Sequence, residues 1–356
     1  MASSDIRSEA RALARLALPA VAHSLLQTMV FLADRLMLGH HSETALASMQ
    51  AAGPVLWTVQ SVFSAFNAGT LAVVGRSVGA DHPAAATSAL RGSLLIAVAL
   101  GLVVGGAGLV GLNPLLAFML GGPRGGVTAA AHSYLSILFA AMPLVFVGSA
   151  TTYALQASGD TRTPFAIAAF TNVLNVALNT LLIFGYAGLP RLGATGAAIA
   201  NASALGVEAL LGLAALSRSG ASVSLRARGA HVDALVGARR VLAVSWSAFG
   251  ERAIYHAGYL VFVRFINGLG ATAMAAHQAL LSIESVSFLS ADGFAVAAGA
   301  TVSRSLGAGD VLRARRAAWI AAGLCASIAA LFALVLAALP GPLIALFRDD
   351  PAMAAQ

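Results

Sequence analysis

The sequence predicts an all-α bundle of membrane-spanning helices, on the basis of its composition, its long apolar runs and its arginine spacing. Of the 356 residues, 59% are hydrophobic and 10% are charged, and the mean hydropathy is +0.84. Soluble domains usually carry about 25% charged residues, so this chain is too apolar to cover a surface that faces water. Only helices and closed barrels satisfy their backbone hydrogen bonds in lipid, and these runs are longer than the roughly 10-residue alternating strands of a barrel.

The apolar runs are long enough to cross a bilayer, which takes about 20 mostly apolar residues. The first run, which begins at Leu16 and carries Pro19, lacks a small-residue cleavage site after it. We therefore interpret it as a span and not as a signal peptide. In chain order we predict nine spans, near residues 16–38, 48–75, 92–118, 128–155, 164–186, 194–216, 241–266, 273–302 and 317–338.

The basic residues, all 21 of them arginine, set the orientation of these spans. With a cytoplasmic N-terminus, 15 arginines lie in inner segments, three in outer segments and three within spans. An excess of arginine on the cytoplasmic side is typical of membrane proteins. We expect a multi-pass protein of the inner (plasma) membrane with its N-terminus in the cytoplasm. The net charge of +7 therefore indicates membrane topology and not a nucleic-acid partner.

An internal repeat appears when the chain is shifted against itself by 228 residues. Residues 74–80 (VGRSVGA) then lie over 302–308 (VSRSLGA), and Pro114 lies over Pro342. Six predicted spans separate equivalent positions, so both copies have the same orientation and form a parallel repeat. The repeat divides the chain into a first lobe of six spans (1–217), a cytoplasmic connector (218–240) and an incomplete second lobe of three spans (241–356). A complete second copy would need about 100 further residues.

Several short motifs occur in a fixed order along the chain. They are residues 31–39 (FLADRLMLG), the two Ser-x-Gly-Ala turns, and residues 156–164 (QASGDTRTP), 172–179 (NVLNVALN), 192–198 (LGATGAA) and 275–278 (AAHQ). In this order and at these spacings, the chain resembles the MATE family of multidrug and toxic compound extrusion transporters. The resemblance implies twelve helices in two six-helix lobes and export driven by inward flow of protons or sodium. Against that pattern, the nine spans predicted here would correspond to the first nine of the twelve helices.

An ionisable residue inside a span suggests a functional site, because an unpaired charge there costs several kcal/mol. Asp34 lies in the outer part of the first span, 15 residues after Pro19. A buried carboxylate can bind and release a proton, or hold sodium together with amide oxygens. The resemblance places the coupling carboxylate at Asp34 and the helix kink at Pro19. The alternative is a structural pair with an arginine of another helix, since Arg35 points about 100° away around the helix.

Three asparagines share one face of the fifth predicted span. Asn172, Asn175 and Asn179 follow an i, i+3, i+7 spacing. Amide hydrogen bonding between membrane helices would explain such a face without any ion site. The resemblance adds Asn175, Asn179 and Thr195 to Asp34 as groups that couple transport to a cation or proton.

The second lobe carries two carboxylates at similar depth, Glu251 and Glu284. On neighbouring helices they could form a second cation site or bind a cationic substrate, and pairing with arginines is the alternative. No metal site is expected, because His40 and His41 have no further ligands at a binding spacing and Cys325 is the only cysteine.

The sequence also excludes several kinds of chemistry. It contains no Walker A motif, no Gly-x-Gly-x-x-Gly with its acidic partner, and no Ser/His/Asp arrangement in a credible context, so we expect no enzyme and no cofactor beyond the coupling ion. The leading hypothesis is a monomeric antiporter that exports amphiphilic or cationic compounds by alternating access between two lobes. Two alternatives stay open: a non-transporting relic or accessory membrane subunit, and a lipid-linked sugar flippase of the same superfamily.

Overall fold

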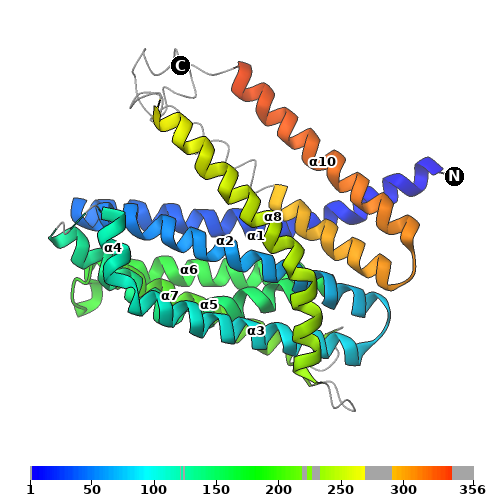
Figure 1. Cartoon of the computed structure of the whole chain (residues 1–356), viewed down its shortest axis with the longest axis horizontal. Coiled ribbons are helices and arrows are strands. Elements are labelled where there is room, and N and C mark those ends of the chain that lie inside the picture. The colour runs from blue at the N-terminus through cyan, green and yellow to red at the C-terminus, as the bar shows by residue number, and fades with distance from the viewer. Residues whose placement is uncertain are drawn as a thin grey trace.

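The computed structural model describes residues 2–120, 122, 125–218, 223–226, 233–268 and 291–338. Within these ranges the chain forms long helices and no strand, which confirms the predicted all-α class (Figure 1). Residues 291–307 are helical as well. The other elements are α1 (Ala2–His41), α2 (Glu43–Gly79), α3 (Pro83–Val110), α4 (Leu112–Leu120), α5 (Gly126–Ser158), α6 (Arg162–Phe184), the 3-10 turn η1 (Tyr186–Gly188), α7 (Ala194–Leu216), α8 (Ala234–Gly268) and α10 (Val311–Ala338).

The prediction of the third span as one continuous helix is wrong. The sequence pattern placed the third span at 92–118, but α3 begins at Pro83 and ends at Val110, and a separate short helix, α4, follows. Gly111 ends α3 by donating its backbone N–H to the Ala107 carbonyl. The start was missed because Pro at the first helical position and the polar first turns extend the helix beyond its apolar stretch. Most of the eighth predicted span, 273–302, lies outside the described residues.

Helix α5 lies at the centre of the first six long helices and packs against α2, α3 and α7, while α6 packs between α1 and α7. Glycines allow the closest approaches. A Cβ at Gly101 of α3 would lie 2.5 Å from Pro143 Cα in α5, and one at Gly212 of α7 would lie 2.8 Å from Thr151 Cβ. In lipid, helices associate through such close packing because lipid tails are as apolar as the side chains.

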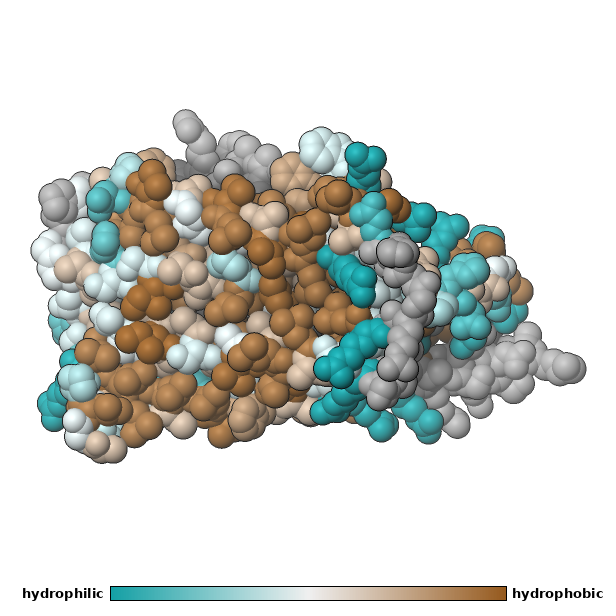
Figure 2. All heavy atoms as spheres, turned by 90° about the horizontal axis from the view of Figure 1, so that it is seen from below, coloured by the Kyte–Doolittle hydropathy of each residue, from teal (hydrophilic) through white to brown (hydrophobic). Residues whose placement is uncertain are grey.

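The surface has the character expected of a membrane protein. By length and composition alone, five described helices could cross a bilayer: α3, α5, α6, α7 and residues 311–334 of α10. Large apolar side chains are exposed on them, such as Val110 at 89% and Val173 at 70%. Figure 2 shows apolar residues covering the broad middle of one face, with hydrophilic residues toward both ends and most densely at one of them. Exposed apolar surface of this extent is rare on soluble monomers and is expected where a protein contacts lipid.

The repeat predicted from the sequence recurs in the backbone. After α2, the N–H groups of Ala80, Asp81 and His82 bond to the carbonyls of Arg76, Val78 and Ser77. After the helical residues 291–307, the same three bonds recur 228 positions later, at Ala308, Gly309 and Asp310. The central residue of each turn has positive φ, 54° at Asp81 and 77° at Gly309. Two sequence copies therefore fold into the same turn.

Candidate functional site

A buried polar cluster surrounds Asp34, in the half of α1 that follows Pro19. The Asp34 side chain is 4% exposed. Its Oδ1 accepts a hydrogen bond from Asn179 Nδ2 of α6 at 2.5 Å, and its Oδ2 accepts one from Asn201 Nδ2 of α7 at 2.6 Å. Hydrogen bonds to a carboxylate are stronger than neutral ones, so three helices are tied together at this one group.

The amides continue into a network. Asn175 Nδ2 donates to Asn201 Oδ1 at 2.8 Å, and Asn179 Nδ2 also donates to Asn175 Oδ1 at 2.9 Å. Asn201 Nδ2 reaches the hydroxyl of Tyr134, a buried residue of α5, at 3.1 Å. Among the described residues, Asn179 Oδ1 is buried without a hydrogen-bond partner. Buried acceptors are rarely left unpaired, so this oxygen is available to a donor or a cation.

The carboxylate has no basic partner among the described residues. Adjacent Arg35 points away from it, toward α2, where a Cβ at Gly53 would lie 3.2 Å from the Arg35 Nη2. Asp34 instead faces α6 and α7, as the 100° step between neighbouring helix residues requires. Within the described part of the chain, the Asp34 side chain is therefore held by amides and not by an ion pair with an arginine.

The α6–α7 connection sets the register of the two asparagine-bearing helices. Gly185 ends α6 at φ 72°, and Gly193 precedes α7 at φ 53°, a conformation that suits glycine. The Leu192 N–H bonds back to the Leu182 carbonyl at 3.0 Å. A Cβ at Gly196 would lie 2.6 Å from that same carbonyl oxygen, so α7 starts in close contact with the end of α6. This contact brings Asn201 level with Asn175 in the neighbouring helix.

The structure brings together some of the residues selected from the sequence and leaves others apart. Asp34, Asn175 and Asn179 meet in the cluster, and Asn172 donates to the Leu26 carbonyl of α1 at 3.1 Å. Thr195 is half-buried at the start of α7, and no hydrogen bond joins its side chain to the cluster within the described residues.

The remaining selected residues lie elsewhere. Pro19 is inside α1, where it removes one backbone hydrogen bond from an otherwise continuous helix. Glu251 is exposed on α8, and Glu284 lies outside the described residues. The second-lobe cation or substrate site therefore stays a prediction.

Asn201 is the residue that the sequence reasoning missed. It is six positions after Thr195, so the two side chains lie about 120° apart around α7. Thr195, which the sequence pattern favours, therefore lies on another face of this helix. A signal was present, because Asn201 is the only amide side chain in the apolar run 194–216 and a buried amide in a membrane helix needs a partner.

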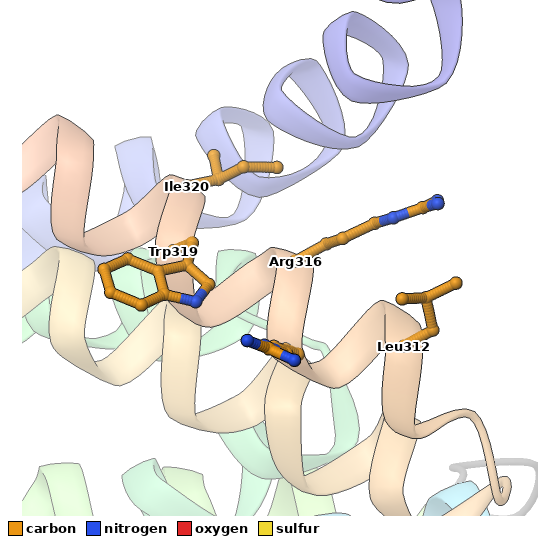
Figure 3. A pocket seen from close by; sticks show the side chains of 5 residues that line it. Leu312, Arg316, Trp319 and Ile320 are labelled. Atoms are coloured by element: carbon orange, nitrogen blue, oxygen red, sulfur yellow. The ribbon is translucent and has the colours of Figure 1, made fainter. Parts of the chain in front are cut away.

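A separate hollow lies on α10, away from the cluster. It has a volume of about 290 Å³ and is lined by Leu312, Arg315, Arg316, Trp319 and Ile320 (Figure 3). All five residues project from the first half of one helix. The hollow is lined by residues of α10 alone, whereas the Asp34 network is built from α1, α5, α6 and α7, so the hollow is no part of this site.

Comparisons with known proteins identify the family of the chain. The MatE family model matches residues 19–181 and 248–356. The chain is 30% identical over 351 residues to the probable multidrug resistance protein NorM of Thermotoga maritima, covering 98% of this chain and 73% of that protein. The corresponding protein of Pseudomonas putida is 33% identical, with 98% and 75% covered.

Two further similarities are to a curated transporter and to a solved structure. An FAD transporter of Shewanella oneidensis is 27% identical over 90% of this chain and 70% of that protein. A solved structure of the Vibrio cholerae MATE transporter VcmN in a bent form has a TM-score of 0.87 and covers 99% of this chain and 78% of its own. Its sequence identity is 20%, so this likeness shows the fold alone.

Proposed function

Because this chain belongs to the MatE family of membrane transporters, we propose that it exports small amphiphilic or cationic molecules in exchange for protons or sodium ions. The observation that carries the proposal is the buried carboxylate of Asp34, held by two amides and by no arginine among the described residues. A carboxylate kept in such a place without a counter-ion is suited to bind a cation or proton reversibly.

The chemistry of the cluster supports either coupling ion. Protonation would neutralise Asp34 and weaken the two hydrogen bonds that it accepts from Asn179 and Asn201. Sodium would be held by oxygen ligands, for which the Asp34 carboxylate and the unpartnered Asn179 Oδ1 are available. In both cases the change at Asp34 alters how α1 is held against α6 and α7. Pro19 lies between this contact and the beginning of α1, at the point where the helix bends most easily.

The proposed cycle alternates access between the two lobes, 1–217 and 241–356, with the substrate path between them. The substrate class rests on relatives, several named for multidrug resistance and one named an FAD transporter. Inside-out membrane vesicles energised by respiration test this directly. We expect them to accumulate tetraphenylphosphonium, a lipophilic cation. Accumulation of FAD instead would indicate that the substrate is an anionic nucleotide. If neither compound accumulates, the result would favour a non-transporting subunit.

The hydrogen bond from Asn201 to Asp34 gives a first specific prediction. Asn201→Leu keeps the approximate size of the side chain. It removes the donor to Asp34 Oδ2, the bond to Tyr134 and the acceptor of the Asn175 amide. Losing a hydrogen bond to a charged group costs about 1.5–3 kcal/mol, so we expect the initial transport rate in vesicles to fall about tenfold or more. Asn172→Leu in α6 is the matched control, because within the described residues its amide donates to the Leu26 carbonyl and not to Asp34. Equal losses of transport rate in both variants would contradict a role for the hydrogen bond between Asn201 and Asp34.

The proposed orientation gives a second prediction. In a Cys325→Ala background, His82→Cys lies in the turn before α3 and Leu189→Cys lies in the loop before α7, and both positions are exposed. We expect a membrane-impermeant maleimide to label position 82 only from the cytoplasmic side and position 189 only from the opposite side. Labelling of both positions from one side would contradict the predicted topology.

A further inference from the structure

The two repeats are related by a two-fold axis. A Cβ at Gly79 would overlap the backbone carbonyl of Arg304, and a Cβ at Gly307 would overlap that of Arg76. The 228-residue shift carries Arg76 and Gly79 onto Arg304 and Gly307, so each turn gives the other the contact that it receives. Reciprocal contacts of this kind define a two-fold interface. A contact seen in one repeat therefore predicts a counterpart in the other.

The axis relates the pair α3 and α8 to the pair α10 and α1. On α3, Ile96 lies in one buried cluster with Val241 of α8. The shift of 228 residues makes Leu324 of α10 and Leu13 of α1 their counterparts, and these two pack in another apolar cluster. Helix α1 therefore lies on α10 as α8 lies on α3.

Next to this contact, one face of α3 is occupied by the connector between the lobes. Three side chains of α3 donate hydrogen bonds to backbone carbonyls of the connector. The pairs are Thr87 with Ser224 at 3.1 Å, Ser88 with Asp233 at 2.9 Å and Arg91 with Leu225 at 3.0 Å. In the first repeat, this face therefore holds an occupant through its oxygen atoms.

The hollow on α10 is the counterpart of that face. The shift carries the three donors of α3, in the same order, onto Arg315, Arg316 and Trp319. Two hydroxyl groups thus become two guanidinium groups, which bind charged oxygen acceptors more strongly and with paired hydrogen bonds. Residues 308–320 carry three arginines and one acidic residue, Asp310. The equivalent place in the second repeat therefore suits an anionic group such as a phosphate.

The hollow lies where a spanning helix meets the lipid headgroups. The arginines of α10 are in its first two turns, and residues 317–338 carry no charge. Figure 3 shows Trp319 and Leu312 on either side of Arg316, and the Trp319 side chain is 68% exposed. Tryptophan is enriched at the level of the headgroups, where one part of its ring is in lipid and another near water.

A strip of small residues continues from the hollow along the same face of α10. Trp319, Gly323, Ala326 and Ala330 follow an i, i+4, i+7, i+11 spacing, and all four are exposed. A Cβ at Gly323 would meet no described atom within 4 Å. The strip gives an acyl chain room to lie against the helix below the indole. A free phosphate ion would use the arginines alone, whereas a phospholipid would use both features.

We propose that the hollow on α10 binds an anionic phospholipid, such as phosphatidylglycerol, at the place equivalent to the connector contact on α3. Arg315 and Arg316 bind the phosphate oxygens, the Trp319 indole packs on the glycerol region, and an acyl chain follows the strip of small residues. Basic pockets at the ends of membrane helices are suited to such headgroups. The inference rests on membrane residence and does not depend on the proposed transport function.

Native mass spectrometry of the detergent-purified chain tests this site. The chain is titrated with dioleoyl-phosphatidylglycerol and, separately, with dioleoyl-phosphatidylcholine, which has the same acyl chains and no net charge. We expect the first phosphatidylglycerol to bind at least about tenfold more tightly than the first phosphatidylcholine. The double variant Arg315→Gln/Arg316→Gln is expected to lose this preference. Trp319→Ala, which changes no charge, is expected to weaken phosphatidylglycerol binding as well.

The matched control is Arg239→Gln/Arg240→Gln. It also removes two adjacent arginines, which are exposed near the start of α8 and do not line the hollow. We expect this variant to keep the preference for phosphatidylglycerol. An equal loss in both double variants would show a general attraction to basic surface and would overturn the site.

Other occupants give different results. Inorganic phosphate that binds as tightly as phosphatidylglycerol would show a site for a free anion and overturn the lipid assignment. Dimers that dissociate in Arg315→Gln/Arg316→Gln would show that a second copy of the chain fills the hollow, with the same consequence. Should that variant fail to fold, crosslinking of the wild type with photoactivatable phosphatidylglycerol decides the matter. We expect crosslinks within residues 312–330, and crosslinks confined to other helices would refute the site.

Discussion

Replacing Asp34 by asparagine is expected to lower the initial rate of transport in respiring inside-out vesicles at least about tenfold. Asparagine has nearly the same shape, and it can still accept one hydrogen bond from the amides of Asn179 or Asn201. It cannot carry the negative charge that a proton or sodium ion would neutralise. We therefore expect the variant to fold and to insert in amounts similar to the wild type, while transport is lost.

Asp310→Asn is the control for this substitution. Asp310 is exposed, and its side chain accepts the Arg313 N–H at the start of α10, a capping role that asparagine fills equally well. We expect Asp310→Asn to transport at the wild-type rate. An Asp34→Asn protein that transports as fast as Asp310→Asn would show that the buried carboxylate is not needed.

Gly101→Leu is expected to have the largest effect on the fold. A Cβ at this position would lie 2.5 Å from Pro143 Cα and 2.8 Å from Pro143 N, so backbone atoms of α5 would have to move. Overpacking a tight contact typically costs 1–3 kcal/mol, and we expect at least about 2 kcal/mol here because no flexible side chain can give way. The thermal midpoint and the monodisperse fraction of the detergent-purified protein should both fall.

Gly106→Leu, in the same helix, is the comparison. A Cβ at Gly106 would meet nothing within 4 Å, and this residue is exposed on α3. We expect its thermal midpoint to stay near that of the wild type or to rise, because leucine is a better helix former than glycine. Equal destabilisation at both positions would contradict the tight α3–α5 crossing.

The fold class and the helix order could be predicted from the sequence, because apolar runs of membrane length leave no other structure possible. Helix ends were harder to predict. α1 runs from Ala2 and α2 continues to Gly79, beyond the apolar parts that hydropathy detects. The break at Gly111 lies inside an apolar run, where hydropathy cannot distinguish a turn from a continuous helix.

The polar cluster was predictable in part. The spacing of Asn172, Asn175 and Asn179 correctly placed them on one face of α6, because helix geometry fixes which residues share a face. The pairing of that face with Asn201 depends on the register between α6 and α7. The close contact of Gly196 with the Leu182 carbonyl sets this register, and it is a tertiary feature that the sequence does not reveal.

The crossing of the two turns could not be predicted either. The 228-residue repeat shows that residues 75–80 and 303–308 are equivalent. Equivalence alone does not place two segments in contact, because most pairs related by a two-fold axis lie far from it. The structure gives the glycines at 79 and 307 a physical reason, because a Cβ at Gly79 would overlap the Arg304 carbonyl and one at Gly307 would overlap the Arg76 carbonyl.

Coupling of export to a cation gradient through Asp34 is tested most directly in proteoliposomes. Purified wild-type and Asp34→Asn chains would be reconstituted, and a proton gradient or a sodium gradient imposed separately while tetraphenylphosphonium uptake is followed. We expect at least one gradient to drive uptake by the wild type, and neither gradient to drive it in the variant. Uptake that persists unchanged in Asp34→Asn under both gradients would contradict the assignment of Asp34 as the coupling site.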